Sequence, residues 1–461
     1  MLTILLLSSA YAEAEKPALE QDETTAEESE TQDPPKPLER GFINTTLENG
    51  LQVSILTEPA HPIVSTQTWV EIGSAHEADN EKGFAHMFEH LMFGQTENYG
   101  PKDYNRHHIR YGGYENAYTA FDNTVYISII PPEGHSEVLK MESDRLVNLI
   151  LEEENLTNEK KIVTEELRMR GENNPFSRLL NIGLGALFGE HPYGSSPAGT
   201  KEDIQSADLE LCRKFYAGYY QPENLHLVVV GPVNGEDTLE QVKALYGEMD
   251  KPDAIKAPEV PKLNDWEFPS DIRLKEDIPP MKIAAQMFVV PDATHEDYWA
   301  LRTMGSMLVG SGQDLFREEM VTKRGKALEA GSFVEDIFKQ GGMAVFGAVS
   351  LPTRSRRSMH KHIGLSIDAL AEKEWLTEEN LLSARKGLEI AEYQKIYDAD
   401  AQADAIGWAH SRLGNAESGV SGYADQVSQV TLEDVSRVFD TYIANAEPVK
   451  LFIKKGKGEE Q

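Results

Sequence analysis

The feature that most limits the possible fold is an order of expected elements that occurs twice, on either side of one proline-rich segment. Residues 249–261 hold three prolines and few apolar side chains, so we place a domain boundary there. In each half an early strand is followed by helices and a returning strand. This repeat predicts an α+β fold of two homologous α/β-sandwich-like domains, each a mostly antiparallel sheet with helices packed on it.

The first half begins with a hairpin signal. Asn49-Gly50 separates two alternating apolar runs within residues 42–56. Apolar periodicity then predicts strands at 63–72, 114–130 (a strand pair) and 225–233, and helices at 83–93, 133–150 and 157–171. We expect Thr157 to be the N-cap of the last of these helices.

The second half repeats the pattern. We expect strands at 282–290, 341–349 and 449–455, and helices at 295–312 and 377–397. The predicted domains are therefore 41–250 and 263–461, joined by a linker at 251–262.

The first forty residues are expected to lie outside the folded domains. Residues 2–12 join a short apolar run to Ala10-Tyr11-Ala12, a pattern typical of a secretory signal cleaved after Ala12 (residues 1–12). We therefore expect export to the periplasm or the extracellular space. No Lys or Arg precedes the run, so the alternatives are a true start further upstream or an uncleaved leader that tethers the chain to a membrane. The run itself is too short to span a bilayer. Residues 13–40 are acidic and proline-rich, and we expect a disordered tether.

Charge and cysteine content exclude several classes of function. The chain has 44 Lys and Arg against 77 Asp and Glu, a net charge of −33. This charge repels phosphate backbones and argues against nucleic-acid binding. The single cysteine, Cys212, allows no intrachain disulfide and no thiolate metal cluster. Any metal chemistry must therefore use His and carboxylate ligands.

His86, Glu89 and His90 form an H-x-x-E-H pattern within a predicted helix. Residues four apart project from one helix face, which is the arrangement that a divalent ion needs from two imidazoles. Glu89 stands close enough to reach a water at such an ion without being a ligand itself. The alternative is an amphipathic core helix with hydrogen-bonded histidines.

A catalytic zinc needs a third protein ligand, and the segment at 157–171 offers candidates. Glu159 and Glu166 are seven apart and share one helix face, whereas Glu165 points roughly a hundred degrees away. Glu166 could ligate while Glu159 stands behind it. From the residues alone, Glu165 remains a rival ligand.

Taken in order, six motifs resemble the inverzincin metallopeptidases, the family of pitrilysin, insulysin and the mitochondrial processing peptidase. They read VEIGSAHE at 70–77, GFAHMFEHLMFGQT at 83–96, GGYENAYTAFDNTVY at 112–126, EKKIVTEEL at 159–167, HPYGSSPAGTKEDI at 191–204 and YYQPENLHLVVVGPV at 219–233. The resemblance extends from Phe42 to the C-terminus and implies that this chain forms half of a clamshell.

Several site residues follow from the resemblance. It implies one Zn²⁺ per chain held by His86, His90 and Glu166, and so favours Glu166 over Glu165. Catalysis would use Glu89 as general base on a zinc-bound water and Glu159 as an assisting carboxylate. Asn116, Ala117 and Tyr118 would lie on an edge strand that pairs with the substrate backbone.

One departure from the family concerns the stabilisation of the oxyanion. Relatives carry an Arg and a Tyr seven residues apart, and the matching positions here are Val321 and Leu328, whose side chains cannot donate a hydrogen bond. We therefore expect a homologous partner subunit that supplies the missing pair. A homodimer could instead use Arg317 and Arg324, although ordinary helix-surface charge is the simpler interpretation of those two residues.

The sequence thus predicts a zinc endopeptidase that cleaves short or unstructured peptides, with a second half that carries no metal. The second function class is a non-catalytic binding or assembly subunit, which the Val321 and Leu328 positions favour and the H-x-x-E-H pattern opposes.

Overall fold

The computed structural model describes residues 38–173, 175–249, 255, 257–310 and 314–456. The expected signal segment and nearly all of the expected tether fall outside these residues. Residues 38–461 form one compact unit. Among the described residues, no helix combines the length and the apolar character that a membrane span requires.

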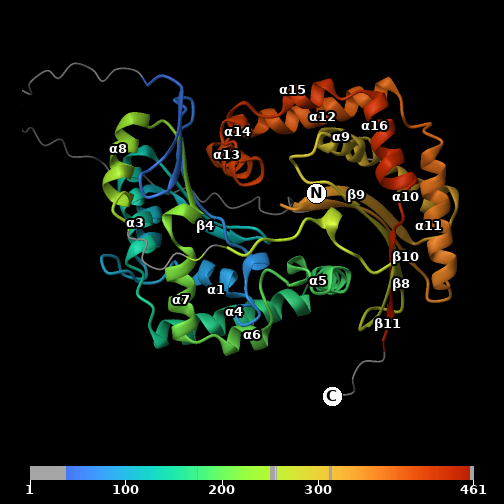
Figure 1. Ribbon diagram of the computed structural model, residues 1–461, viewed down its shortest axis with the longest axis horizontal. Helices are drawn as coiled ribbons and strands as arrows, with labels where there is room; N and C mark the ends of the chain where they lie inside the picture. Colours follow the sequence, from blue (N-terminus) through green and yellow to red (C-terminus); the bar gives the residue numbers. More distant parts are fainter. Residues whose placement is uncertain (1–37, 174, 250–254, 256, 311–313, 457–461) are drawn as a thin grey trace, which may run out of the picture. The chain divides into compact units, whose positions relative to one another are not determined.

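The first half is built on a six-stranded sheet in the order β1-β2-β6-β3-β5-β4 (Figure 1). Its strands are β1 (Gly41–Thr46), β2 (Gln52–Thr57), β3 (Val64–Val70), β4 (Tyr114–Thr119), β5 (Thr124–Ile130) and β6 (Leu225–Gly231). Neighbours are antiparallel except β2 and β6, which are parallel. Strand β4 therefore occupies one edge of this sheet.

Among the described residues, eight α-helices accompany that sheet. They are α1 (Phe84–Leu91), α2 (Asp103–Tyr111), α3 (Pro132–Val147), α4 (Glu153–Asn173), α5 (Pro175–Phe188), α6 (Lys201–Ser206), α7 (Leu209–Tyr219) and α8 (Gly235–Tyr246). The apolar side chains of α1, among them Phe84, Met87 and Phe88, are fully buried in the main core cluster. This burial fixes α1 against α4 and β4, so that its polar side chains face both elements.

The second half has a five-stranded sheet in the order β7-β11-β8-β10-β9. Its strands are β7 (Asp271–Glu276), β8 (Lys282–Val290), β9 (Glu329–Phe338), β10 (Gly341–Ser350) and β11 (Val449–Lys455). Only the β7–β11 pair is parallel. The helices are α9 (Tyr298–Val309), α10 (Leu315–Arg317), α11 (Arg356–Ala371), α12 (Glu378–Ile396), α13 (Ala399–Leu413), α14 (Glu417–Ser421), α15 (Ala424–Gln429) and α16 (Leu432–Phe439).

Each half thus has one mostly antiparallel sheet accompanied by helices, which confirms the predicted α+β class. One local prediction was wrong: Thr157 is not an N-cap, because α4 begins at Glu153 and Thr157 lies in its second turn. Glu153 and Glu154 occupy the first turn, where acidic side chains interact favourably with the helix dipole. Thr377, where the sequence predicts the start of a helix, is the N-cap of α12, since its side chain accepts a hydrogen bond from the Asn380 N–H.

Helix α13 of the second half packs on β3 and β6 of the first half. The contact is close because Gly407 lies against the Trp69 indole, where an added Cβ would come within 2.1 Å of Trp69 Cε2. Asp400 accepts hydrogen bonds from Ser65 and Gln67 at 2.9 and 2.8 Å. The two halves thus pack directly on each other.

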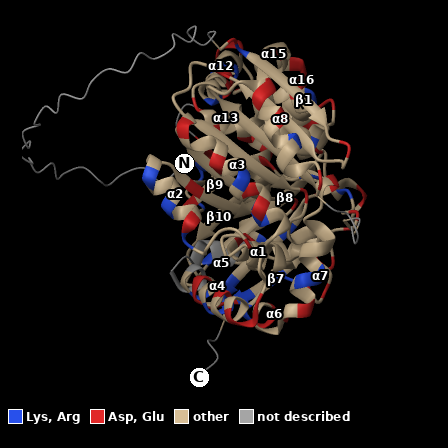
Figure 2. Ribbon diagram, turned by 90° about the vertical axis from the view of Figure 1, so that its left-hand side faces the viewer, with Lys and Arg blue, Asp and Glu red and all other residues tan. Residues whose placement is uncertain are grey.

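Charged side chains cover both halves. Figure 2 shows Asp and Glu residues spread over many helices, with Lys and Arg residues among them. In the described residues, acidic and basic side chains are therefore interspersed (Figure 2).

Candidate metal centre and catalytic cleft

A buried carboxylate holds the start of the helix that carries the two histidines. Glu77 Oε2 accepts the Gly83 N–H and Glu77 Oε1 accepts the Ala85 N–H, each at 2.8 Å. Gly83 has φ +80°, and a Cβ there would meet Ile204 and the Gly199 backbone. Glu77 satisfies N–H groups that the first turn of a helix leaves without partners, so α1 begins at a fixed position.

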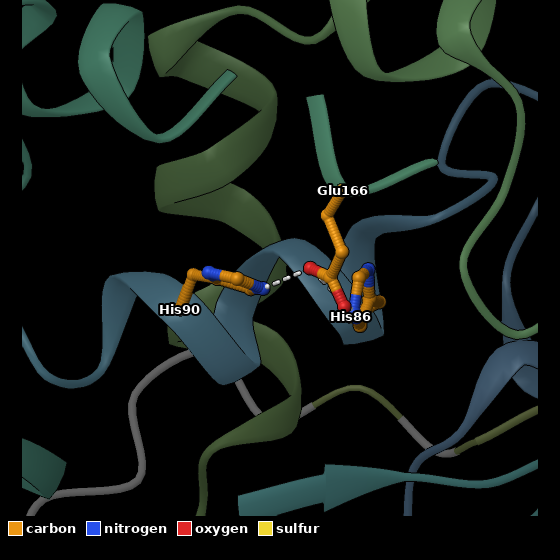
Figure 3. A group of neighbouring side chains, drawn as sticks. All are labelled: His86, His90 and Glu166. Carbon is orange, nitrogen blue, oxygen red and sulfur yellow. Dashed lines mark ion pairs between the residues drawn. The ribbon is translucent and has the colours of Figure 1, made fainter. Parts of the chain in front are cut away.

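His86 and His90 lie on one face of α1, with Glu166 of α4 opposite them (Figure 3). Glu166 Oε2 is 3.7 Å from His86 Nε2 and 3.2 Å from His90 Nε2. The three prospective ligand atoms all lie within 4.8 Å of one another. His86 is buried, whereas His90 and Glu166 are half-buried.

This donor set fits zinc. Two neutral imidazoles and one carboxylate are a known catalytic zinc set, with ligand distances of about 2.0–2.2 Å that place tetrahedral ligand atoms about 3.3 Å apart. The two measured separations bracket that value. Three protein ligands also leave a fourth position for water or substrate, as a catalytic rather than a structural site requires.

The neighbouring carboxylates of α4 have different surroundings. Glu159 Oε2 lies 3.6 Å from His90 Nδ1, the ring nitrogen that does not face Glu166. Glu165 is exposed and pairs with Arg168 at 2.6 Å. The helix period therefore directs Glu159 and Glu166 into the site and Glu165 away from it.

Negative charge dominates the electrostatics around His90. Burial disfavours the imidazolium, but the carboxylates of Glu159, Glu166 and Glu89 outweigh it and raise the pKa of His90 above its ordinary value. A divalent cation would meet the same field. The site thus attracts positive charge even though zinc ligation needs the neutral imidazole.

Glu89 and the edge strand β4 share a small pocket beside the histidines. The pocket has a volume of about 240 Å³ and is lined by Glu89, His90, Phe93, Glu115, Asn116 and Ala117. The Thr119 hydroxyl donates to Glu89 Oε2 at 2.6 Å. A carboxylate, a candidate metal ligand and a strand edge therefore border one pocket.

Three other predicted residues lie elsewhere. The Tyr118 side chain points to the opposite face of β4, where its hydroxyl donates to Asp404 of α13 and its ring packs edge-on against Trp69. Val321 packs against the core of the second half, and the Leu328 side chain is 54% exposed. Neither Val321 nor Leu328 is among the described residues that line the pocket.

Four of these residues have no role that the sequence predicts: Glu77, Phe93, Glu115 and Thr119. Phe93 stands three residues after His90, and the helix period could have indicated it. Thr119 is thirty residues from Glu89. No local spacing reveals contacts of that kind.

Known proteins resemble the chain in both halves. The family profile described as "Insulinase (Peptidase family M16)" matches residues 52–200, and the profile described as "Peptidase M16 inactive domain" matches residues 206–388. The first match contains His86, His90 and Glu166, while the second covers most of the half without the candidate ligands.

Individual relatives match over nearly the whole chain. The chain is 28% identical over 416 residues to the zinc protease PqqE of Helicobacter pylori. The aligned region covers 89% of this chain and 92% of that protein. It has the fold of a solved protease from Helicobacter pylori, with a TM-score of 0.79, 24% identity, and coverage of 90% of this chain and 99% of that chain. The periplasmic protease PqqL from Escherichia coli matches with a TM-score of 0.69 and 17% identity, over 92% of this chain but 48% of that chain.

Proposed function

Because the chain belongs to the insulinase (peptidase M16) family, we propose that it is a zinc-dependent endopeptidase that hydrolyses short or unstructured peptides. The observation that carries this proposal is the grouping of His86, His90 and Glu166 beside Glu89 and the edge strand β4. Bound zinc would supply Lewis acidity toward the scissile carbonyl and the attacking water.

The residues of the chain supply the rest of the reaction. Glu89 takes a proton from the attacking water and returns it to the leaving amine. Glu159 orients the His90 ring through Nδ1, the nitrogen that does not face Glu166. The main chain of Asn116, Ala117 and Tyr118 pairs with an extended substrate by β-augmentation, which suits unstructured peptides because folded proteins offer few free strands.

A homologous partner subunit completes the site in this proposal. Val321 and Leu328 offer no donor for the oxyanion, so the missing Arg and Tyr would come from the partner. The chain matches only 48% of PqqL, so PqqL is long enough to contain a second homologous half. This length difference supports the proposal of a partner subunit. A homodimer is the other arrangement.

Peptide hydrolysis by the purified, zinc-loaded chain tests the enzyme assignment. We expect Glu89→Gln to lower turnover by about 10²–10⁴-fold, the usual contribution of a general base, while zinc content stays at one per chain. Glu165→Gln, on the exposed side of α4 and directed away from the site, is the matched control and should keep wild-type turnover. Full activity of Glu89→Gln would refute the mechanism.

The partner requirement needs a separate comparison. Turnover of the chain alone is measured against turnover with a homologous subunit that carries the Arg/Tyr pair, and against a Val321→Arg/Leu328→Tyr variant. We expect the partner to raise turnover. Since neither Val321 nor Leu328 is among the described residues that line the pocket of their own chain, the double variant should raise turnover only if two copies of the chain pair as a homodimer. Wild-type activity that a partner does not raise would count decisively against complementation in trans.

A non-catalytic binding or assembly subunit is the second candidate function, which the absence of donor side chains at Val321 and Leu328 favours. It predicts peptide binding without hydrolysis, with or without the partner. Glu89→Gln would then leave every measured property unchanged.

Export is part of the same proposal. The pattern ending at Ala12 supports a cleaved secretory signal, and the PqqL relative is described as periplasmic. N-terminal sequencing of the protein from its native host should begin at Glu13. A mature protein that retains residues 1–12 would favour a membrane-tethered form instead.

A further inference from the structure

We infer that Thr119 is a positioning residue that fixes the orientation of the Glu89 carboxylate. This inference rests on the proposed function, since it gives Glu89 the role of general base. The Thr119 hydroxyl donates to Glu89 Oε2 at 2.6 Å, a length typical of strong hydrogen bonds between a hydroxyl and a carboxylate. A carboxylate is planar, so holding Oε2 also limits where the other oxygen can lie.

Thr119 can act in this way because its own position is fixed. It is the last residue of β4 and pairs with Thr124, the first residue of β5. Between them the Ala120 N–H donates to the Asn123 carbonyl at 2.8 Å and closes a tight turn. The turn is buried, with Asp122 only 2% exposed.

Asp122 anchors this turn at two further points. Its Oδ1 accepts the Tyr193 hydroxyl at 2.7 Å, and its Oδ2 accepts the Lys339 N–H at 2.8 Å. Lys339 belongs to the turn between β9 and β10, so the second half of the chain helps to hold the first half's β4–β5 turn. Beside Asp122, Phe121 packs on Phe338 with the centres of the two rings 4.9 Å apart.

The side-chain chemistry of threonine suits the role. Its β-branched side chain has restricted χ1 rotamers, so the hydroxyl loses little freedom when it binds Glu89. Alternation along β4 puts Thr119 on the face of Ala117, which lines the pocket, and Tyr118 on the other face. The strand proposed to bind substrate therefore also holds the base, which fixes the base relative to the scissile bond.

This geometry separates the effect of Thr119 from zinc binding and from substrate affinity. The Thr119 hydroxyl contacts Glu89, and the candidate ligands are other side chains. Its loss removes the hydrogen bond that holds Oε2 of Glu89, and a displacement of the carboxylate by about 1 Å can cost about 10²-fold in rate. Turnover should fall while KM and zinc content stay unchanged.

The test compares wild-type and variant forms of the zinc-loaded full chain, with the partner if turnover requires it. Thr119→Val keeps the shape and should lower kcat by about 10- to 100-fold, whereas Thr119→Ser keeps the hydroxyl and should stay within about threefold of wild type. Thr46→Val on the exposed edge of β1 is the matched control and should retain wild-type kcat. In the Glu89→Gln background, Thr119→Val should have no further effect on kcat.

A crystal structure of Thr119→Val adds a readout that does not depend on activity or on a partner. We expect the Glu89 carboxylate to leave its wild-type rotamer or to occupy several. A retained single rotamer would overturn the inference, as would a Thr119→Ser variant as slow as Thr119→Val. If Thr119→Val does not fold, Thr119→Ala takes its place with the same expected loss.

The two proposals fail in different ways. A fully active Glu89→Gln variant refutes the enzyme mechanism whatever Thr119 does. An inactive Glu89→Gln variant beside a Thr119→Val variant with wild-type kcat refutes the positioning role alone.

Discussion

Glu159 Oε2 lies 3.6 Å from Nδ1 of His90, while Nε2 of the same ring lies 3.2 Å from Glu166. One imidazole is therefore placed between a prospective metal ligand and a carboxylate behind it. In zinc proteins such a carboxylate fixes the orientation of the ring and raises its basicity as a ligand.

The first prediction follows from this pair. Glu159→Gln should weaken zinc binding by about 10- to 100-fold, because an amide supports the His90 ring less strongly than a carboxylate does. Competition with a chelator of known zinc affinity measures the change. Glu165 is next to Glu166 in the sequence, but it lies on the exposed side of α4 and pairs with Arg168. Glu165→Gln should therefore change the zinc affinity less than twofold. Equal losses in the two variants would show a general charge effect.

The second prediction concerns Glu77. Burial raises its pKa to about 8, although the N–H groups of Ala85 and Gly83 oppose the shift. In the unfolded chain it ionises near 4.5, so its contribution to stability is fully present below that pH. Between pH 4.5 and 8 the contribution of Glu77 to the unfolding free energy falls by up to about 1.4 kcal/mol per pH unit. Stability should therefore fall over this range.

Denaturant unfolding of wild type and Glu77→Gln at several pH values isolates this effect. The difference in unfolding free energy between the two proteins should shift in favour of Glu77→Gln as the pH rises toward 8. A constant difference would show that Glu77 is ionised throughout and bound as a carboxylate by Gly83 and Ala85.

The third prediction concerns acid. His135 is buried with its Nε2 at 3.0 Å from Thr66, and burial lowers its pKa to about 4. Its contribution to stability is present above the unfolded value of 6.5 and is lost as the pH falls from 6.5 to 4. His135→Gln should remove up to about 3 kcal/mol of that loss. Equal acid sensitivity of the variant and the wild type in unfolding experiments would contradict this.

The fourth prediction compares two helical glycines. Gly407→Ala should destabilise the chain by at least about 1–3 kcal/mol, because the new methyl group overlaps the Trp69 ring between the two halves. In exposed α12, Gly387 has open space around it, and Gly387→Ala should stabilise by about 0.5–1 kcal/mol. Thermal unfolding measures both. Similar melting temperatures for the two variants would mean that the α13 contact is not rigid.

Local periodicity explains which parts could be predicted from the sequence. The spacing of His86 and His90 and the seven-residue separation of Glu159 and Glu166 follow from the helix period, which the backbone imposes wherever a helix forms. The same reasoning found most of the central strands and the start of α12 near Thr377. It was wrong at Thr157, because a polar residue before an apolar run also occurs inside helices and the acidic first turn of α4 extends further back.

Only the tertiary structure determined which distant groups meet. The contact of Thr119 with Glu89 and that of Tyr118 with Asp404 join residues 30 and 286 positions apart. Such contacts depend on how α1 packs on β4 and how α13 packs on the sheet, and no local pattern encodes either arrangement. The sequence by itself thus determined the two candidate histidine ligands and the helical spacing of the candidate carboxylates, because both depend on backbone geometry. The packing of sheets and helices decided which carboxylate faces the histidines and which hydroxyl holds Glu89.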